Sequence, residues 1–398
     1  MHTSLPLLPP RQGSVFEAGC PECDAHQSGD CLGHETAPCR CIWVAADRRH
    51  GCERCHLVCR DRTTEREGAH ADTFAGHVGA GADLAGVRVF QPRAFGSLPP
   101  FVPLRTHELP LADHAAGFDW VGVDLKTLFS LRDDGTITLR DPFRSGRGVR
   151  SFLGVSERAH LIAVLSGKDD LLEGFWGADR PRLLRHLADI GFVACTGPTF
   201  SVYEQVREAD RLLGGDRVAQ DFRPVPAAHT AVMFRRHHRC LAEAVGVSLV
   251  PVPNLYDLTA HHRETWAGWL RASPNVHCVT RDFSRTPMDG DDYRRHLSGL
   301  IEILRGAGRP LHVLLVGVGL GKAEGTRALI QEAECTVSVV TGDPIVHAIT
   351  GGKGLNAGGT GYEPRPEVSR SDLALSNLRA FADLIGMNNK QPTRHRIL

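Results

Sequence analysis

The strongest chemical signal in this 398-residue sequence is a cluster of cysteines near its start. Two pairs, Cys20 with Cys23 and Cys52 with Cys55, are each separated by two residues. This spacing lets a tight turn point both thiolates at one tetrahedral zinc ion, with Zn–S distances of about 2.3 Å. The predicted metal ligands are Cys20, Cys23, Cys31, Cys39, Cys41, Cys52, Cys55 and Cys59. The pattern therefore predicts two structural zinc ions.

Spacing alone leaves the pairing of ligands and metals open. The two Cys-x-x-Cys pairs would complete one four-cysteine site and the remaining four cysteines a second, although His34, His50 or His56 could replace one thiolate. An iron–sulfur cluster is the alternative, because Cys52, Cys55 and Cys59 also suit cysteine-only ligation. The segment has few aliphatic residues, so we expect metal binding to supply much of its folding free energy.

The other cysteines, Cys195, Cys240, Cys278 and Cys335, are scattered through apolar stretches. We expect them to be buried as small apolar side chains. Disulfide bonds are not expected, because the chain is large and carries no recognisable export signal.

Carboxylates and hydroxyls in three later segments are candidates for acid–base chemistry. The candidate catalytic residues are Glu204, Asp257 and Asp282, and Asn254 precedes the second of them by three residues. Polar residues expected to bind substrate beside them are Asp124, Thr199, Ser201, Tyr203 and Asn254. For Thr199 and Ser201 the alternative is a structural one, since either hydroxyl could cap the amino end of a following helix.

A glycine-rich loop and a second loop near position 343 could together bind a phosphate group. The first contains Gly317, Gly319, Gly321 and Lys322, and the second contains Asp343. Small residues let backbone N–H groups and a helix amino terminus face an anion. The spacing is not that of a Walker loop, and the alternative is that these glycines only permit tight turns.

Alternating strand and helix patterns must position these loops. Short β-branched runs occur at 87–89, 120–123, 161–165, 192–195, 247–252, 276–280, 311–316 and 336–340. Helical spacing occurs between them, at 182–189, 203–213, 231–245, 263–270, 293–305 and 323–333. Such alternation predicts parallel strands joined by crossover helices. Eight strands fit a TIM-like (β/α)8 barrel, with an open doubly wound sheet as the alternative.

In a barrel, ligands bind at the carboxyl ends of the strands, where all the polar and glycine-rich loops above would lie. One segment departs from the alternation: Asp134-Gly135 lies between apolar residues and predicts a β-hairpin. The predicted domains are a tail at 1–19, the cysteine module at 20–62, a linker at 63–86, the barrel at 87–360, and a helix with a basic tail at 361–398.

The charge and hydrophobic composition limits which partners the chain is expected to bind. The 46 basic and 46 acidic residues cancel, so no global positive field draws the chain to nucleic acid or to an anionic membrane. No run of about 18 apolar residues occurs, and we expect a cytoplasmic protein without a membrane partner. Nucleic-acid binding would need a local patch, such as the arginines within the cysteine module.

The segments 196–204, 250–256 and 266–270 resemble an uncharacterised family of bacterial and phage proteins with a barrel-like domain of unknown function. The likeness covers about residues 160 to 345 and implies a barrel without implying a reaction. The general plan is also similar to the barrel of tRNA-guanine transglycosylases, which couple base exchange to zinc. Their Asp-Ser-Gly-Gly-Phe motif is absent here, and in them the zinc ligands lie late in the chain.

The combined expectation is a zinc-binding enzyme that acts on a phosphate-bearing substrate, either a nucleotide or a nucleic acid. The alternative is an accessory factor of a mobile element that binds nucleic acid or protein without catalysis. Polar side chains gathered at one face of the barrel would favour the enzyme.

Overall fold

The computed structural model describes residues 87–105, 118–200, 203–205, 222–224, 227–257, 260–284 and 291–387. The predicted cysteine module and linker lie outside these residues. Contacts divide the chain into two units, of which the larger contains Val87–Thr199 and Arg239–Leu398. The described part of the other unit is the hairpin of β7 (Tyr203–Gln205) and β8 (Phe222–Pro224) with the first half of α9 (Ala227–Gly246).

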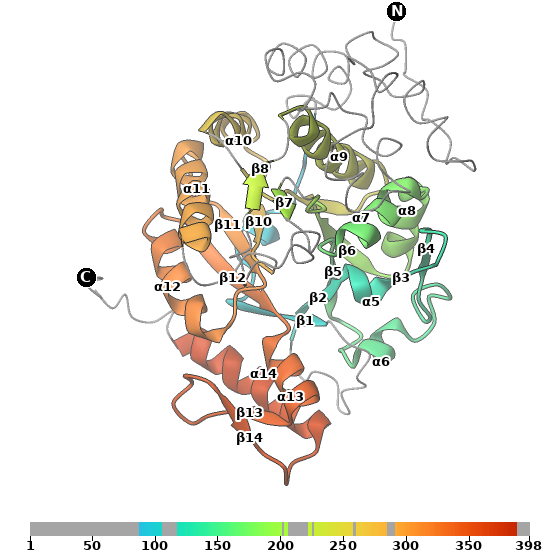
Figure 1. Ribbon diagram of the computed structural model, residues 1–398, viewed down its shortest axis with the longest axis vertical. Coiled ribbons are helices and arrows are strands. Elements are labelled where there is room, and N and C mark those ends of the chain that lie inside the picture. The colour runs from blue at the N-terminus through green and yellow to red at the C-terminus, as the bar shows by residue number, and fades with distance from the viewer. Residues whose placement is uncertain are drawn as a thin grey trace, which may run out of the picture. The chain divides into compact units, whose positions relative to one another are not determined.

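The larger unit is an α/β barrel of eight parallel strands, as the sequence predicts (Figure 1). The strands are β1 (Phe101–Arg105), β2 (Trp120–Asp124), β5 (His160–Val164), β6 (Phe192–Thr196), β9 (Val250–Val252), β10 (Cys278–Asp282), β11 (His312–Val316) and β12 (Thr336–Thr341). Each barrel strand except β9 pairs with the next barrel strand along the chain, and β12 returns to β1. The seam between β9 and β10 is nearly closed by a bridge between Asn254 and Thr280.

Alternate residues of the strands fill the barrel with apolar side chains. This core includes Val102, Leu104, Ile162, Val164, Ala194, Val252, Cys278, Leu314, Val316 and Val340. Gly122 takes the inward position on β2, where a Cβ atom would lie 3.0 Å from the Leu104 side chain. Asp124, Asn254 and Asp282 follow the inward residues Gly122, Val252 and Cys278 of their strands by two or four positions. Because strand side chains alternate between faces, these three polar side chains lie on the same inward face.

The first strand is not where the sequence pattern placed it. Residues 87–89 are not a strand; β1 is Phe101–Arg105, whose sequence signal is weak because it has one β-branched residue and a proline, Pro103. The 87–89 segment leads to Gln91, whose side-chain amide donates to Pro251 O and Cys278 O, both at 2.9 Å. It thus lies at the amino-terminal ends of β9 and β10.

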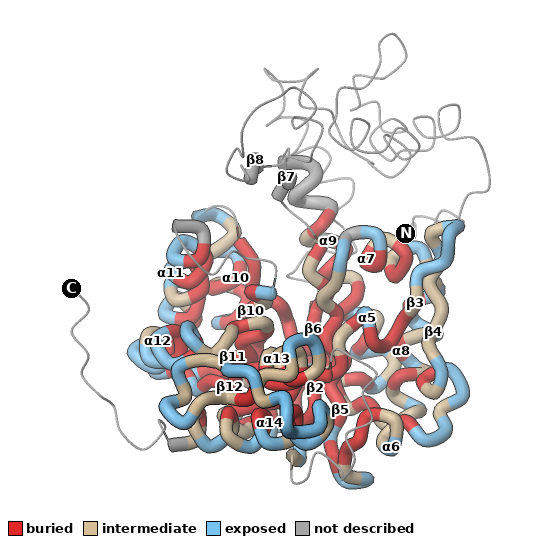
Figure 2. The backbone as a smooth tube through the Cα atoms, turned by 60° about the horizontal axis from the view of Figure 1, so that its bottom comes forward, coloured by how far each residue is buried: buried red, intermediate tan, exposed pale blue. Residues whose placement is uncertain are grey.

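Helices and short hairpins surround the strands. The described helices of the larger unit, besides the second half of α9, are α5 (Leu125–Leu128), α6 (Val149–Leu153), α7 (Asp169–Gly177), α8 (Arg180–Asp189), α10 (Ala260–Ala272), α11 (Asp291–Ala307), α12 (Leu320–Gln331), α13 (Asp343–Gly351) and α14 (Arg370–Met387). Figure 2 shows the strands buried, whereas the outer faces of α11 and α12 are exposed. No helix in the described ranges has the length and apolar character needed to span a bilayer.

Two described β-hairpins of the larger unit lie outside the eight-stranded sheet. The hairpin predicted at Asp134-Gly135 is present, between β3 (Phe129–Leu131) and β4 (Ile137–Leu139). A second hairpin, β13 (Lys353–Leu355) with β14 (Tyr362–Pro364), follows α13. Helix α14, which the sequence assigned to a separate C-terminal region, packs on β1, with the Phe381 and Phe101 rings 4.9 Å apart. It therefore belongs to the larger unit with the strands.

Candidate functional site

Asp282 is the centre of a polar cluster at the carboxyl ends of the strands. Its Oδ2 accepts hydrogen bonds from the hydroxyls of Ser166 and of Thr199, the latter at 3.4 Å. Its Oδ1 accepts the backbone N–H of Ser284 at 2.8 Å. These donors come from the loops after three different strands, β5, β6 and β10, so the barrel itself fixes the direction of the carboxylate.

Asn254 extends this cluster from the end of β9. Its side-chain amide donates to Thr199 Oγ1, and its Oδ1 accepts the N–H of Asp282 at 3.3 Å. Asn254 is only 2% exposed, whereas Asp282, Thr199 and Ser166 are half-buried. The structure thus brings together Thr199, Asn254 and Asp282 from the predicted set, with a carboxylate accessible above a buried amide.

Asp124 lies at the end of β2, on the inward face. Its Oδ1 accepts the backbone N–H of Thr127 at 2.7 Å and caps the short helix α5. This bond occupies one carboxylate oxygen in a local structural role. Its part in substrate binding stays a prediction.

Asp257, the second catalytic candidate, has a different environment. It is 5% exposed and lies 3.0 Å from Arg263 Nη1 and 3.6 Å from Arg281 Nη1. A Cβ atom at Gly299 of α11 would come within 2.6 Å of its carboxylate, so the group is packed against that helix. Asp257 thus links Arg281 of β10 with Arg263 of α10, and its catalytic role stays a prediction.

The candidates Ser201, Tyr203 and Glu204 cannot be grouped with Asp282. Ser201 lies outside the described residues. Tyr203 and Glu204 belong to strand β7, in the smaller unit, with Glu204 opposite Arg223 of β8. The helix predicted to begin at residue 203 is therefore wrong at its start, and the capping role considered for Thr199 and Ser201 loses its basis.

The glycine-rich loop forms the turn between β11 and α12. Gly317 has φ +76°, and a Cβ atom there would lie 2.5 Å from the Ser284 backbone. Gly317 thus permits β11 to pass closely beside the Asp282 loop. Gly319 is the N-cap of α12, and Gly321, in its first turn, has open space around it. The need for a tight turn therefore explains the glycine at position 317. This agrees with the alternative that these glycines only permit tight turns.

Asp343 lies where the sequence interpretation expected a phosphate group. It begins α13 directly after β12, and its carboxylate accepts the backbone N–H of Leu320, the first residue of α12. A Cβ atom at Gly319 would lie 2.5 Å from Asp343 Oδ2. The small residue therefore makes room for a carboxylate of the chain itself, which corrects the expected anion site at this helix terminus.

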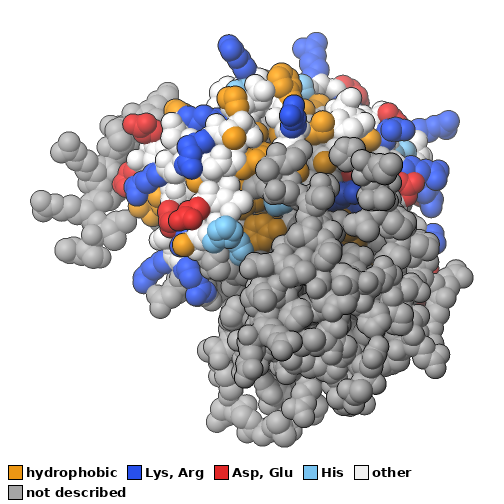
Figure 3. All heavy atoms as spheres, turned by 90° about the horizontal axis from the view of Figure 1, so that it is seen from above, with side chains coloured by type: hydrophobic (Ala, Val, Ile, Leu, Met, Phe, Trp, Pro, Cys, Tyr) orange, Lys and Arg blue, Asp and Glu red, His pale blue; other side chains and the backbone are white. Residues whose placement is uncertain are grey.

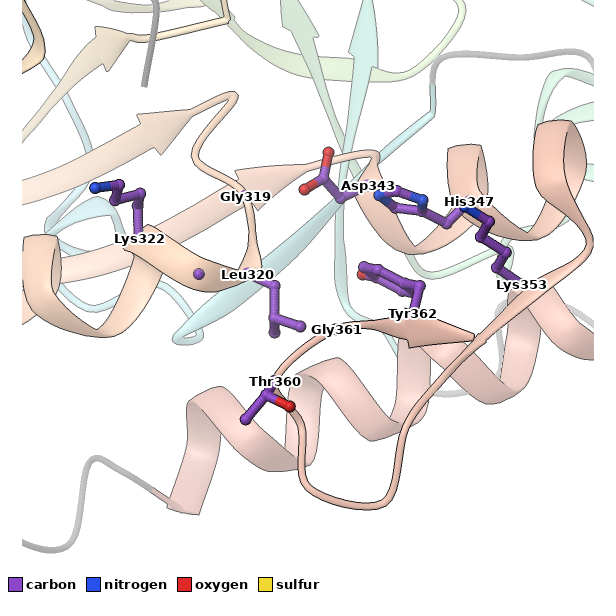
Figure 4. Close-up of a pocket in the computed structure, with 10 residues that line it drawn as sticks. Gly319, Leu320, Lys322, Asp343, His347, Lys353, Thr360, Gly361 and Tyr362 are labelled. Atoms are coloured by element: carbon purple, nitrogen blue, oxygen red, sulfur yellow. The ribbon is translucent and has the colours of Figure 1, made fainter. Parts of the chain in front are cut away.

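A pocket of about 400 Å³ opens beside Asp343 (Figure 4). Its lining residues are Gly319, Leu320, Gly321, Lys322, Asp343, His347, Lys353, Thr360, Gly361 and Tyr362. His347 follows Asp343 by one helical turn, and its ring stacks on Tyr362 with centroids 4.0 Å apart. Burial raises the pKa of Asp343, while the nearby imidazole of His347 and the Leu320 N–H act in the opposite direction.

The two lysines of this region point in different directions. Figure 4 shows Lys353 beside His347, whereas the Lys322 side chain extends away from Asp343. Lys322 Nζ lies 5.9 Å from the ring centroid of Tyr293 on α11. Both lysines line the pocket, and the substrate-binding role predicted for Lys322 stays a prediction.

Sequence reasoning missed His347 and Tyr362. Four residues separate Asp343 and His347, a helical spacing that could have joined them once the helix was assigned. Tyr362 carries no local signal, because it reaches the pocket from a hairpin that the pattern of strands and helices did not predict. Ser166 and Ser284 were visible as polar residues after strands, but their convergence on Asp282 depends on strand order.

The described residues hold no group of three or more His, Cys, Asp or Glu side chains suited to a metal ion. The eight predicted zinc ligands lie outside them. Cys195, Cys240, Cys278 and Cys335 are free and buried, as predicted.

Charge on the surface is mixed. Figure 3 shows Lys and Arg side chains spread singly over the described part of one face, with Asp and Glu side chains among them. No protein-family model matches this chain, and no curated protein or solved structure matches it either.

Proposed function

We propose that this chain is an enzyme whose substrate binds over the carboxyl ends of the barrel strands, with Asp282 as the catalytic carboxylate. The single observation that supports this is the gathering of Ser166, Thr199, Ser284 and Asn254 around Asp282. A carboxylate with a structural role, such as Asp257, is enclosed by its partners. Asp282 instead has donors on both oxygens and stays accessible, as expected for a group that meets a reacting atom from one fixed direction.

The chemistry available to Asp282 is that of a general base or a nucleophile. Both roles require a carboxylate oxygen within hydrogen-bond or bonding reach of the substrate. Ser166 and Thr199 are held beside it and would orient a polar group of the substrate. Asp257 takes no part in this proposal, because its charge is paired with two arginines.

The substrate class that we propose is a phosphate-bearing molecule, either a nucleotide or a nucleic acid. Lys353 lines the pocket beside Asp343, and Lys322 extends from the neighbouring loop. The phosphate would bind at these side chains, away from the α12 terminus that Asp343 occupies. The zinc ions proposed for the cysteine module would stabilise that module, with no assigned part in the reaction at Asp282.

The test is turnover by the full chain of a panel of nucleotides and oligonucleotides, followed by mass spectrometry of the products. Asp282→Asn should lower the rate by at least about 100-fold, because it removes the acid–base group but keeps its shape. Asp133→Asn, at an exposed position of the β3–β4 turn, is the matched control and should keep full activity. Undiminished turnover by Asp282→Asn would remove the proposed role. Binding without turnover by the wild type would favour the accessory factor.

A further inference from the structure

The pocket beside Asp343 contains a buried hydroxyl that the protein leaves without a partner. Tyr362 Oη has no hydrogen-bond partner among the described residues, although a buried phenol ordinarily has one. Burial and the negative charge of Asp343 both raise the pKa of Tyr362, so its O–H proton stays in place at neutral pH. Tyr362 is also held in position, because its ring stacks on His347 at an interplanar angle of 18°. The phenol therefore lies in the pocket wall with its buried hydroxyl unpaired by any described residue.

Asp343 supplies the second half of the site. Its carboxylate accepts one N–H from Leu320 and is close enough to Tyr362 for the two to interact electrostatically. An ionised carboxylate has about four acceptor positions, and one backbone N–H leaves most of them open to a ligand. The pocket therefore presents a carboxylate acceptor and a phenol that can both donate and accept.

These two groups select one kind of ligand atom. A group placed between them must donate to Asp343 and pair with the Tyr362 hydroxyl. A phosphate oxygen cannot donate when ionised and is repelled by the Asp343 charge. An ammonium group could donate to both Asp343 and the Tyr362 oxygen, but it has no lone pair to accept the Tyr362 proton, which would stay without a partner. An alcohol can donate to Asp343 and accept that proton, since a hydroxyl has one donor and two acceptor positions.

We propose that this pocket binds the vicinal hydroxyls of a sugar, with Asp343 and Tyr362 as the residues that recognise them. A carboxylate can accept from two neighbouring hydroxyls at once, and acidic residues recognise ribose hydroxyls in this way in dinucleotide-binding folds. The pocket volume of about 400 Å³ falls within the usual range for small-molecule sites, roughly 300 to 1,000 Å³. Lys353 lies on the same wall and suits a phosphate attached to the sugar.

The identification of the sugar as ribose rests on the proposed function, since a nucleotide substrate is assumed there. The recognition of a diol rests only on the pocket. The two ideas separate experimentally, because Asp282 does not line this pocket. Asp282→Asn should abolish turnover yet keep the preference for a ribose diol.

The experiment is calorimetric titration of the full chain with AMP, GMP, CMP and UMP and with their 2′,3′-dideoxy counterparts. The paired ligands share base and phosphate and differ only in the two hydroxyls. We expect at least one ribonucleotide to bind roughly 10- to 100-fold more tightly than its dideoxy form, the effect of hydrogen bonds to a charged group. Tyr362→Phe and Asp343→Asn should each lower the ribonucleotide affinity about 10-fold or more and leave the dideoxy affinity unchanged.

Asp133→Asn serves as the control and should keep the full preference. Tyr362→Phe removes one oxygen atom, and its unfolding temperature should match that of the wild type, so a loss of binding would not reflect unfolding. Equal affinity for the paired ligands would overturn the proposal, as would an undiminished preference in Tyr362→Phe. Failure of every nucleotide and of ribose 5-phosphate to bind would overturn it as well.

Discussion

Two aspartates near strand ends differ in environment because their neighbours differ. Asp282 has hydroxyl and N–H donors and an accessible edge, whereas Asp257 is enclosed by Arg263, Arg281 and α11. Arg281 is itself 4% exposed and donates to Leu255 O. Without Asp257, the buried Arg281 guanidinium would lose the carboxylate that lies 3.6 Å away, whereas Arg263 would keep Glu302.

The first prediction follows from this pairing. Asp257→Asn should lower the free energy of unfolding by about 3 kcal/mol, because it leaves the Arg281 charge buried without a carboxylate. Glu302→Gln is the control: Glu302 also pairs with Arg263, at 2.7 Å, but is 57% exposed, so its loss should cost no more than about 1 kcal/mol. Chemical denaturation measures both values. Similar costs for the two variants would contradict the buried role.

A second prediction concerns His312, a buried residue at the start of β11. Its ring nitrogens pair with Thr336 Oγ1 at 2.7 Å and with Ser338 Oγ at 2.8 Å. Burial lowers the pKa of His312 from 6.5 to about 4. In the unfolded chain the imidazole takes up a proton near pH 6.5, whereas in the folded barrel it does so only near pH 4. The stabilising effect of the neutral, buried His312 is therefore complete above pH 6.5 and is lost as the pH falls to about 4.

This pKa shift of His312 corresponds to a contribution on the order of 3 kcal/mol to the free energy of unfolding, which is lost over this pH range. The free energy of unfolding of the wild type should thus fall more steeply between pH 7 and pH 4 than that of His312→Gln. Denaturation curves at several pH values would measure the two slopes. Other histidines contribute equally to both proteins, so identical slopes would show that His312 is not the cause.

At the scale of elements, the strand-to-helix turns decide which side chains meet. The turn after β11 passes so close to the Asp282 loop that only glycine fits at position 317. The turn also places Gly319 against Asp343, on the other side of the loop. One short segment thus lies between the Asp282 cluster and the pocket beside Asp343 and borders both.

The third prediction tests this turn. Gly317→Ala should destabilise the protein by at least about 1 kcal/mol, because an L side chain is strained at φ +76° and its Cβ would meet the Ser284 backbone. Gly325→Ala, at an exposed position of α12 with no atom near its Cβ, should instead stabilise by roughly 0.5–1 kcal/mol. Thermal unfolding of both variants would decide the matter. A neutral Gly317→Ala would mean that the turn can relax.

The sequence predicted seven of the barrel strands from their apolar runs, and β1 was missed because its five residues include a single β-branched side chain beside Pro103. Asp282, Asn254 and Thr199 could be proposed together because strand ends of a parallel barrel share one face. The Asp343 pocket could not, since it needs the carboxylate to turn toward the α12 terminus and Tyr362 to arrive on a hairpin. Pairing of Asp257 with Arg281 likewise depends on contacts between elements, which spacing does not encode.

For the whole molecule, the described barrel explains its own stability without a metal. Its strands enclose a continuous apolar core, and four buried cysteines lie within the larger unit as ordinary apolar side chains. Burial raises the pKa of Cys195 to about 12, so this thiol stays protonated and is unsuited to ligation. The eight clustered cysteines therefore differ from these four in spacing, and we expect them to differ in chemistry.

The last prediction is that the full chain contains about two zinc ions, because eight cysteines supply two tetrahedral sets. Elemental analysis of purified protein measures this directly. Cys23→Ser and Cys52→Ser should each lower the zinc content by about one ion, and the thermal transition of the barrel should stay in place, since metal binding stabilises only the segment that it folds. Cys335→Ala, which changes a buried barrel cysteine, should keep both ions. Iron with acid-labile sulfide would replace the zinc assignment by the iron–sulfur alternative, and a metal-free chain with all eight thiols reactive would refute the module.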